Sequence, residues 1–238
     1  MTADPLLLMG EVDLATERLL RTAATLDEAG LAGPSLLPGW TRGHVLAHVA
    51  RNADAMVNLL IAARTGEDIP AYASAADRDA DIETGSGRTL EIQLDDLRES
   101  AARFADVAAA MPMEAWAAVV TARSGPRVAA TLVWGRLREI EVHHVDLNAG
   151  YTSADWPAAC GHRLLHEVVA DLAGRTDVPA MVLHPDEAAH ELVIGQPSGT
   201  TTVSGPAHEL ACWLIGRSAG DRLSATPTGQ LPTPPKWL

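Results

Sequence analysis

Two segments far apart in the sequence carry residue types that bind metal ions in proteins. The first contains His44 and His48, and the second, much later in the chain, contains Glu139 and His143. Glu139 and His143 are four residues apart, so on a helix they share one face. A histidine from another helix, His48 or His44, would complete a set of two histidines and one carboxylate. Three protein ligands leave coordination positions open, as in catalytic zinc sites, so the pattern predicts metal-assisted chemistry.

The choice between the two early histidines rests on their positions in the helix. His48 borders the expected apolar face, whereas His44 lies in the first turn, where an exposed or capping side chain is more common. We therefore expect His48 to be the third ligand. Two histidines and one carboxylate also suit mononuclear iron, so the donor set alone leaves the metal open.

An ordinary solvated helix face is the competing interpretation of the second segment. Glu141 and His144 point away from the polar stripe on this helix and are expected to supply solvent-facing polarity. The helix then has more polar directions than one exposed face requires, which favours a metal site. The polar stripe itself consists of Arg136, Glu139, His143 and Asp146.

Two other groups of residues could take part in chemistry. His162 and His166 form another i,i+4 pair, followed by Glu167, but they lack an obvious third ligand, so we expect a surface role. Arg217 is expected to end the last helix and to open a glycine-flanked loop. Its guanidinium could interact favourably with the helix C-terminus or hold a carboxylate through two hydrogen bonds.

Composition limits the classes of function. The chain has 238 residues, a formal net charge of −13 and 47% hydrophobic residues. The acidic balance argues against binding to a nucleic-acid backbone, and no apolar stretch is long enough to predict a membrane span or a secretory signal. Cys160 and Cys212 are the only cysteines and are expected to be reduced and packed as small hydrophobic residues. We expect a cytoplasmic protein without membrane or nucleic-acid partners.

Helical periodicity dominates residues 1–150 and predicts an antiparallel four-helix bundle. Bundles of this kind place metal sites in their core, on facing helices. Residues 67–87 are expected to form a loop or short helical turns, and residues 111–126 are expected to be irregular. The four helices are predicted over residues 13–28, 41–64, 89–110 and 130–147.

In residues 151–238, short strand-like segments lie between helical ones. This pattern predicts a small α+β domain, so the whole chain is expected to be α+β. Asp155 is expected to cap a helix over residues 156–173, and the tail 226–235 is expected to be extended. The other elements predicted here are strands over 180–184, 191–195 and 200–204, and a helix over 206–217.

These segments together resemble the mycothiol-dependent maleylpyruvate isomerase family. The resemblance runs through residues 40–53 and 138–147, through Gly216 and Arg217, and through the ending at residues 232–238. It covers nearly the whole chain, and the N-terminal part resembles the DinB-type metal-binding bundle. The bundle motif is shared by many thiol-dependent transferases, whereas its combination with the C-terminal ending is more specific.

The resemblance implies an activity and a set of site residues. Zinc would be held by His48, Glu139 and His143, and Arg217 would be the catalytic arginine. The implied enzyme uses mycothiol as its thiol cofactor to convert the small molecule maleylpyruvate to fumarylpyruvate in gentisate breakdown. We expect the protein to be a monomer. A mycothiol S-transferase on the same scaffold and a non-catalytic metal-binding protein remain the alternatives.

Overall fold

The computed structural model describes residues 5–123, 125–196, 201–234 and 237. The chain divides into two compact units, Met1–Tyr151 and Thr152–Leu238. Position 200 of the expected third strand and positions 235, 236 and 238 of the C-terminal ending lie outside the described residues. Among the described residues, no helix has the length and apolar character needed to cross a membrane.

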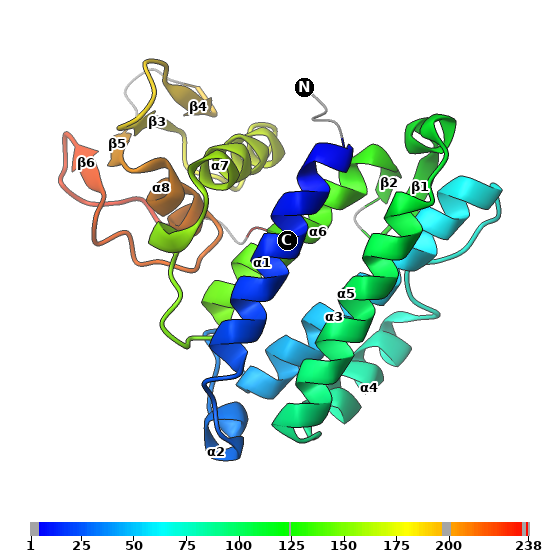
Figure 1. Ribbon diagram of the computed structural model, residues 1–238. Helices are drawn as coiled ribbons and strands as arrows, with labels where there is room; N and C mark the ends of the chain where they lie inside the picture. The colour runs from blue at the N-terminus through cyan, green and yellow to red at the C-terminus, as the bar shows by residue number, and fades with distance from the viewer. Residues whose placement is uncertain (1–4, 124, 197–200, 235–236, 238) are drawn as a thin grey trace. The chain divides into compact units, whose positions relative to one another are not determined.

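Four helices of the first unit form the predicted bundle (Figure 1). Helix α3 packs against α5 and α6, and α1 packs against the same two helices, so the four enclose a common apolar core. The mixed helix and sheet composition of the chain confirms the α+β class. The helices of the bundle are α1 (Pro5–Ala23), α3 (Arg42–Thr65), α5 (Leu90–Ala109) and α6 (Ala130–Asp146).

Both ends of α3 follow the sequence signals. The Thr41 hydroxyl accepts a hydrogen bond from the backbone N–H of His44, and the His44 side chain accepts one from the backbone N–H of Thr41. This reciprocal capping satisfies two backbone N–H groups at the start of the helix. Gly66 ends the helix in the left-handed conformation, with φ of 74°, which glycine adopts without steric cost.

Two expectations for the first unit are wrong. The first helix ends at Ala23, and Asp27 caps a separate short helix, α2 (Glu28–Ala32). Residues 67–87 were expected to lack a long helix, yet they contain α4 (Ala75–Ser86), capped by Ser74. Helix α4 lies close against α3, because a Cβ at Gly85 would be only 2.8 Å from the Cβ of Ala47.

The segment between α5 and α6 is also more ordered than expected. A 3₁₀ helix, η1 (Met113–Ala117), precedes an antiparallel hairpin made of β1 (Val119–Ala122) and β2 (Gly125–Val128). The strands are only four residues long and mostly exposed, so they carry little of the apolar alternation that predicts a strand.

The second unit combines α7 (Ala158–Leu172) and α8 (Ala207–Leu214) with a four-stranded sheet. The sheet order is β4-β3-β5-β6, in which β3 and β5 are parallel and the outer pairs are antiparallel. The two helices pack on each other, and α8 also contacts β3 and β5. The strands are β3 (Met181–Pro185), β4 (Leu192–Ile194), β5 (Thr201–Gly205) and β6 (Ser224–Thr226).

Some details of the second unit differ from the sequence predictions. Asp155 does not cap α7, because Pro157 occupies that position. The Asp155 carboxylate instead accepts hydrogen bonds from the backbone and hydroxyl of Thr152, around the short 3₁₀ helix η2 (Ser153–Asp155). Strand β6 was not predicted, and α8 ends before Arg217.

Candidate metal centre

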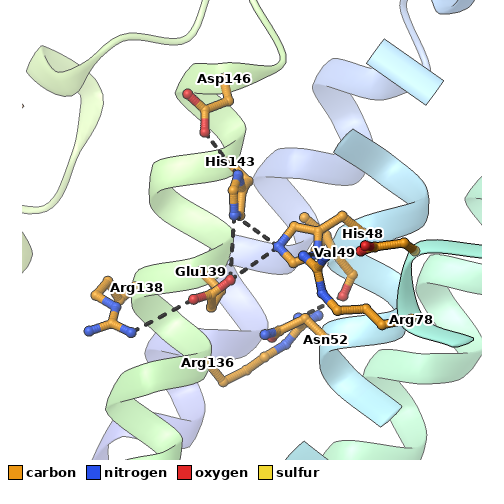
Figure 2. A network of polar contacts seen from close by, with 10 residues as sticks. His48, Val49, Asn52, Arg78, Arg136, Arg138, Glu139, His143 and Asp146 are labelled. Carbon is orange, nitrogen blue, oxygen red and sulfur yellow. Dashed lines mark hydrogen bonds and ion pairs between the residues drawn. The ribbon is translucent and has the colours of Figure 1, made fainter. Parts of the chain in front are cut away.

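His48 from α3 meets Glu139 and His143 from α6 in the core of the bundle. Glu139 Oε2 lies 3.3 Å from His48 Nε2 and 3.4 Å from His143 Nε2, and the two Nε2 atoms are 3.0 Å apart. Figure 2 shows the three side chains pointing toward one another. His48 is 5% exposed, and Glu139 and His143 are partly buried, so the cluster is largely shielded from solvent.

The dimensions of the cluster suit a tetrahedral metal ion. Zinc bonds to nitrogen and oxygen of about 2.0–2.1 Å place two ligand atoms of a tetrahedral site about 3.3 Å apart. The three separations in the cluster all lie close to this value. Among the described residues, this is the one group of three or more histidine, cysteine or carboxylate side chains with such convergence.

Asp146 fixes the orientation of one imidazole. His143 Nδ1 lies 2.9 Å from Asp146 Oδ2, and the Asp146 side chain is fully buried. The Asp146 carboxylate holds a proton on Nδ1, so Nε2, which faces the other two side chains, is the atom that can bind a metal once its own proton is lost. Histidine ligands of metals usually have such a partner. Asp146 belongs to the polar stripe of α6, but its spacing in the sequence does not predict this role.

The surroundings of the two histidines in the cluster shift their pKa values in opposite directions. Burial, with repulsion from His143, lowers the pKa of His48 to about 4. Burial opposes charge on His143 too, but hydrogen bonds to Asp146 and Glu139 raise its pKa to about 9. Burial alone would raise the pKa of Glu139, yet its hydrogen bonds with the two histidines hold that pKa well below the usual value. At neutral pH the metal-free cluster therefore contains a carboxylate, one imidazolium and one neutral imidazole.

The alternative early histidine has a different role. His44 closes the capping box of α3 through Nδ1, and its Nε2 lies 3.1 Å from the exposed carboxylate of Glu83. Trp40 stacks on His44 and meets His48 edge-on, with ring centroids 6.0 and 5.6 Å away. The structure thus brings His48, and not His44, to Glu139 and His143.

Comparisons with known proteins agree along the whole chain. The family model of the mycothiol maleylpyruvate isomerase N-terminal domain matches residues 12–148, and that of the corresponding C-terminal domain matches residues 155–236. The chain belongs to the mycothiol maleylpyruvate isomerase family. Two solved structures are similar: the mycothiol-dependent maleylpyruvate isomerase and a variant of it with one histidine replaced by alanine. Each has 29% identity and a TM-score of 0.92, over 99% of this chain and 98% of the other. No curated protein sequence matches the chain.

Arg217, which the resemblance implies is catalytic, lies in the second unit of this chain. Gly216, with φ of 75°, follows the end of α8, and the backbone N–H of Arg217 donates to the Cys212 carbonyl. The N–H of Gly216 donates to the Trp213 carbonyl, which completes a Schellman motif. The Arg217 guanidinium donates to the Ile215 carbonyl at 2.8 Å. The turn therefore fixes the backbone from which Arg217 extends.

The second histidine pair lies in the same C-terminal unit as Arg217. His162 and His166 lie on α7, and the His166 ring stacks on that of His190 at 5.7 Å. Among the residues with described positions, neither belongs to a metal-ligand cluster.

The expected solvent-facing role of Glu141 and His144 is wrong, because both are 1% exposed. Glu141 accepts hydrogen bonds from Arg18 and the Tyr151 hydroxyl, at 2.5 and 2.6 Å. His144 stacks on Tyr151 and lies 2.8 Å from the Thr22 hydroxyl. The contacts of these two side chains with Arg18 and Thr22 join α6 to α1 in the interior of the bundle. An i,i+3 spacing alone could not distinguish a second buried network from an exposed face.

Arg136 is buried as well, although it belongs to the polar stripe. It is 1% exposed and donates to the Val49 carbonyl and to Asn52 Oδ1, at 2.7 and 2.9 Å. Burial lowers its pKa to about 10, while the charge of Glu139 opposes that shift. The polar stripe is thus an internal network along α6, and it joins α6 to α3 beside the metal-ligand cluster.

Proposed function

We propose that this protein is a zinc-dependent, mycothiol-dependent isomerase that converts maleylpyruvate to fumarylpyruvate. The observation that carries the proposal is the convergence of His48, Glu139 and His143 within 3.4 Å in a chain of this family. The similar solved structures are described as a mycothiol-dependent maleylpyruvate isomerase. Family, fold and donor set therefore all support the same activity.

The reaction requires rotation about a carbon–carbon double bond. Addition of the thiol to the cis double bond leaves a single bond that turns freely, and expulsion of the thiol restores the double bond in the trans form. The electron pair of the double bond passes to the conjugated carbonyl as an enolate and returns when sulfur leaves. No net oxidation takes place, and the thiol is regenerated.

Each residue of the cluster has a distinct part in preparing this chemistry. Bound zinc would favour the thiolate form of the thiol near neutral pH, or polarise a carbonyl oxygen. His48 and His143 would hold it through Nε2, with Glu139 as the negatively charged ligand. Asp146 would keep His143 in the tautomer that leaves Nε2 free to bind. Burial of His48 excludes water from one side of the site.

Arg217 is proposed as the catalytic arginine on the basis of the family resemblance. A fixed guanidinium stabilises negative charge that develops on an enolate oxygen. Arginine also stays charged at all physiological pH values. Cys160 and Cys212 are buried and have no role in this scheme, because the external thiol supplies the nucleophile.

The proposal is tested by incubating zinc-loaded protein with maleylpyruvate and a small amount of mycothiol. We expect many molecules of fumarylpyruvate per thiol, with free thiol restored at the end. Consumption of one thiol per product would instead identify an S-transferase. Absence of any thiol-dependent turnover in protein with one bound zinc would identify a non-catalytic metal-binding protein. Glu83→Gln is the control for a Glu139→Gln variant in the same assay, because it removes an exposed carboxylate beside His44, outside the metal-ligand cluster. Its turnover should equal that of the wild type.

A further inference from the structure

A cavity opens beside the metal-ligand cluster in the first unit. Its volume is about 140 Å³, and His48 and Glu139 form part of its wall. The remaining wall comes from α3, from α4 with the segment preceding it, and from the turn of the β1–β2 hairpin. A cavity of about 150 Å³ accommodates a molecule of benzene size, so this space suits a short organic molecule next to the metal position.

Two arginines line this cavity and give it a positive charge. Arg78 comes from α4, and Arg123 comes from the hairpin turn. Both charges act on the hydroxyl of the half-buried Tyr72, whose pKa is raised by burial while the two arginines oppose that rise. Glu139 is the one acidic side chain in the described lining of the cavity. The cavity is therefore cationic in a chain whose net charge is −13, and a bound divalent metal would strengthen that contrast.

The carboxylate that pairs with Arg78 is the exposed one of Asp79. The Arg78 guanidinium lies 5.8 Å from the centre of the Tyr72 ring and donates to Asp79 Oδ1 at 2.7 Å. The Asp79 side chain is 70% exposed, whereas that of Arg78 is 14% exposed. Exposed ion pairs contribute little to stability, so an anion in the cavity can compete with Asp79 for this guanidinium.

The contact between Arg78 and His48 also points to a ligand. Arg78 Nη2 lies 3.4 Å from His48 Nδ1, and Figure 2 shows the two side chains next to each other. A metal ion on Nε2 would leave the proton on Nδ1, and a guanidinium has no acceptor for that proton. Arg78 therefore cannot orient a metal-bound His48 in the way that Asp146 orients His143. Its N–H groups are better suited to a negatively charged group that enters the cavity.

Apart from Tyr72 and Asn52, whose amide oxygen accepts a hydrogen bond from Arg136, the rest of the lining is apolar. Its apolar side chains include Met56 and Leu59 from α3, together with Ala71 and Ala122. These side chains offer few hydrogen bonds to a sugar or a nucleotide. They suit a short carbon chain, with its acidic group directed toward the arginines.

We propose that Arg78 and Arg123 form a carboxylate-binding pair that fixes how an acidic substrate is oriented in this cavity. The pair holds one acid group of the ligand, while the reacting carbons lie over His48 and Glu139. This inference rests on the proposed isomerase function and extends it, because it names the residues that orient the substrate. Arg78 and Arg123 are substrate-binding residues and do not bind the metal.

The inference is tested by the binding of succinate to zinc-loaded protein, measured by calorimetry without thiol. We expect saturable binding to the wild type, and none of the neutral isostere succinamide. Loss of one charge-assisted hydrogen bond weakens binding roughly ten- to a hundred-fold, so Arg78→Gln and Arg123→Gln should each show a loss of that size. Arg78→Lys should restore part of the affinity. All variants should retain one zinc.

Arg127→Gln is the matched control, since Arg127 lies on the same hairpin, is exposed and does not line the cavity. Its affinity should equal that of the wild type. If Arg78→Gln fails to fold, Arg123→Gln decides the outcome alone. Unchanged succinate affinity in Arg123→Gln, equal binding of succinamide, or no saturable binding to the wild type would overturn the inference.

The same variants separate this inference from the proposed function. With maleylpyruvate and mycothiol, the arginine variants should mainly raise KM, and kcat should change less. Succinate binding needs neither thiol nor turnover, so its result stands even if the wild type proves inactive as an isomerase. Normal isomerase turnover with unchanged KM in both arginine variants would reject the carboxylate pair and leave the isomerase intact.

Discussion

Replacement of Glu139 by glutamine tests the metal centre most directly. The change preserves the shape of the side chain but removes the one negative charge among the three converging groups. Structural zinc binds with roughly 10–16 kcal/mol, so an equal share for one of three ligands is about 3–5 kcal/mol. The zinc dissociation constant should then rise by roughly two to four orders of magnitude. Competition with a chromophoric chelator measures this change, and metal analysis after gel filtration should find little zinc in the variant.

Thermal unfolding provides an independent measurement of the same loss. Free zinc at about 1,000 times its dissociation constant stabilises the folded state by about 4.1 kcal/mol. For domains of this size each 1 kcal/mol shifts the melting temperature by about 2–4 °C, so zinc should raise the wild-type Tm by roughly 8–16 °C. Glu139→Gln should lose most of that rise, whereas Glu83→Gln should keep it. A variant that retains one zinc per chain and the full rise in Tm would refute the assignment of Glu139 as a ligand.

Four further outcomes follow from the structure and the family resemblance. Arg217→Ala should keep its zinc and lose turnover by roughly a hundred- to a thousand-fold; normal turnover, or parallel loss of metal, contradicts the catalytic role. His162→Ala and His166→Ala should each retain one zinc, and metal analysis checks this. Asp146→Ala should weaken zinc binding roughly 10- to 100-fold, and an unchanged affinity would remove its orienting role. Because the pKa of His143 is raised to about 9, zinc must displace a proton at pH 7. Zinc affinity should therefore rise about tenfold per pH unit below pH 9, and a flat profile between pH 7 and 8.5 would show that His143 carries no proton.

The sequence predicts the converging residues because their positions depend on simple helical geometry. Glu139 and His143 lie one turn apart on α6, and this spacing fixes their shared face before any packing is known. The placement of His48 requires one further step, namely that its helix borders α6 in a bundle. Thr41 and Gly66 mark the ends of that helix, so the position of His48 within it was predictable.

The cavity beside the metal centre could not be predicted by the same reasoning. Arg78 lies on α4, where only Ile82 and Gly85 are buried, so the sequence shows no apolar periodicity there. Arg123 lies in a hairpin whose strands are short and mostly exposed. Tertiary contacts place these segments, in particular the close approach of Gly85 to Ala47. Sequence periodicity carries no signal of such contacts.

The buried polar groups of α6 show a second limit of sequence reasoning. Polar residues in many directions around one helix predict that some are internal, but not which ones. Glu141 and His144 are satisfied by Arg18, Tyr151 and Thr22, which lie far away in the sequence or beyond the helix end. A buried charge is tolerated only with such partners. The choice between buried and exposed therefore depends on α1, and the sequence of α6 alone cannot decide it.

The metal-free cluster illustrates how one set of contacts can serve both folding and metal binding. The partly buried Glu139 carboxylate is paired with the His143 imidazolium, which Asp146 holds on its other side. Arg138 Nη2 lies 3.7 Å from the second carboxylate oxygen of Glu139. The ligand atoms therefore lie within 3.4 Å of one another without metal, so no large rearrangement is needed when zinc replaces the proton. The same proton makes metal affinity depend on pH, because zinc and H⁺ compete for His143 Nε2. Asp146 accordingly has two opposing effects: it raises the pKa that zinc must overcome, and it fixes the imidazole in the orientation that zinc requires. Asp146→Asn should separate them, since loss of the negative charge would flatten the pH dependence of zinc affinity while the retained amide oxygen could still orient the ring.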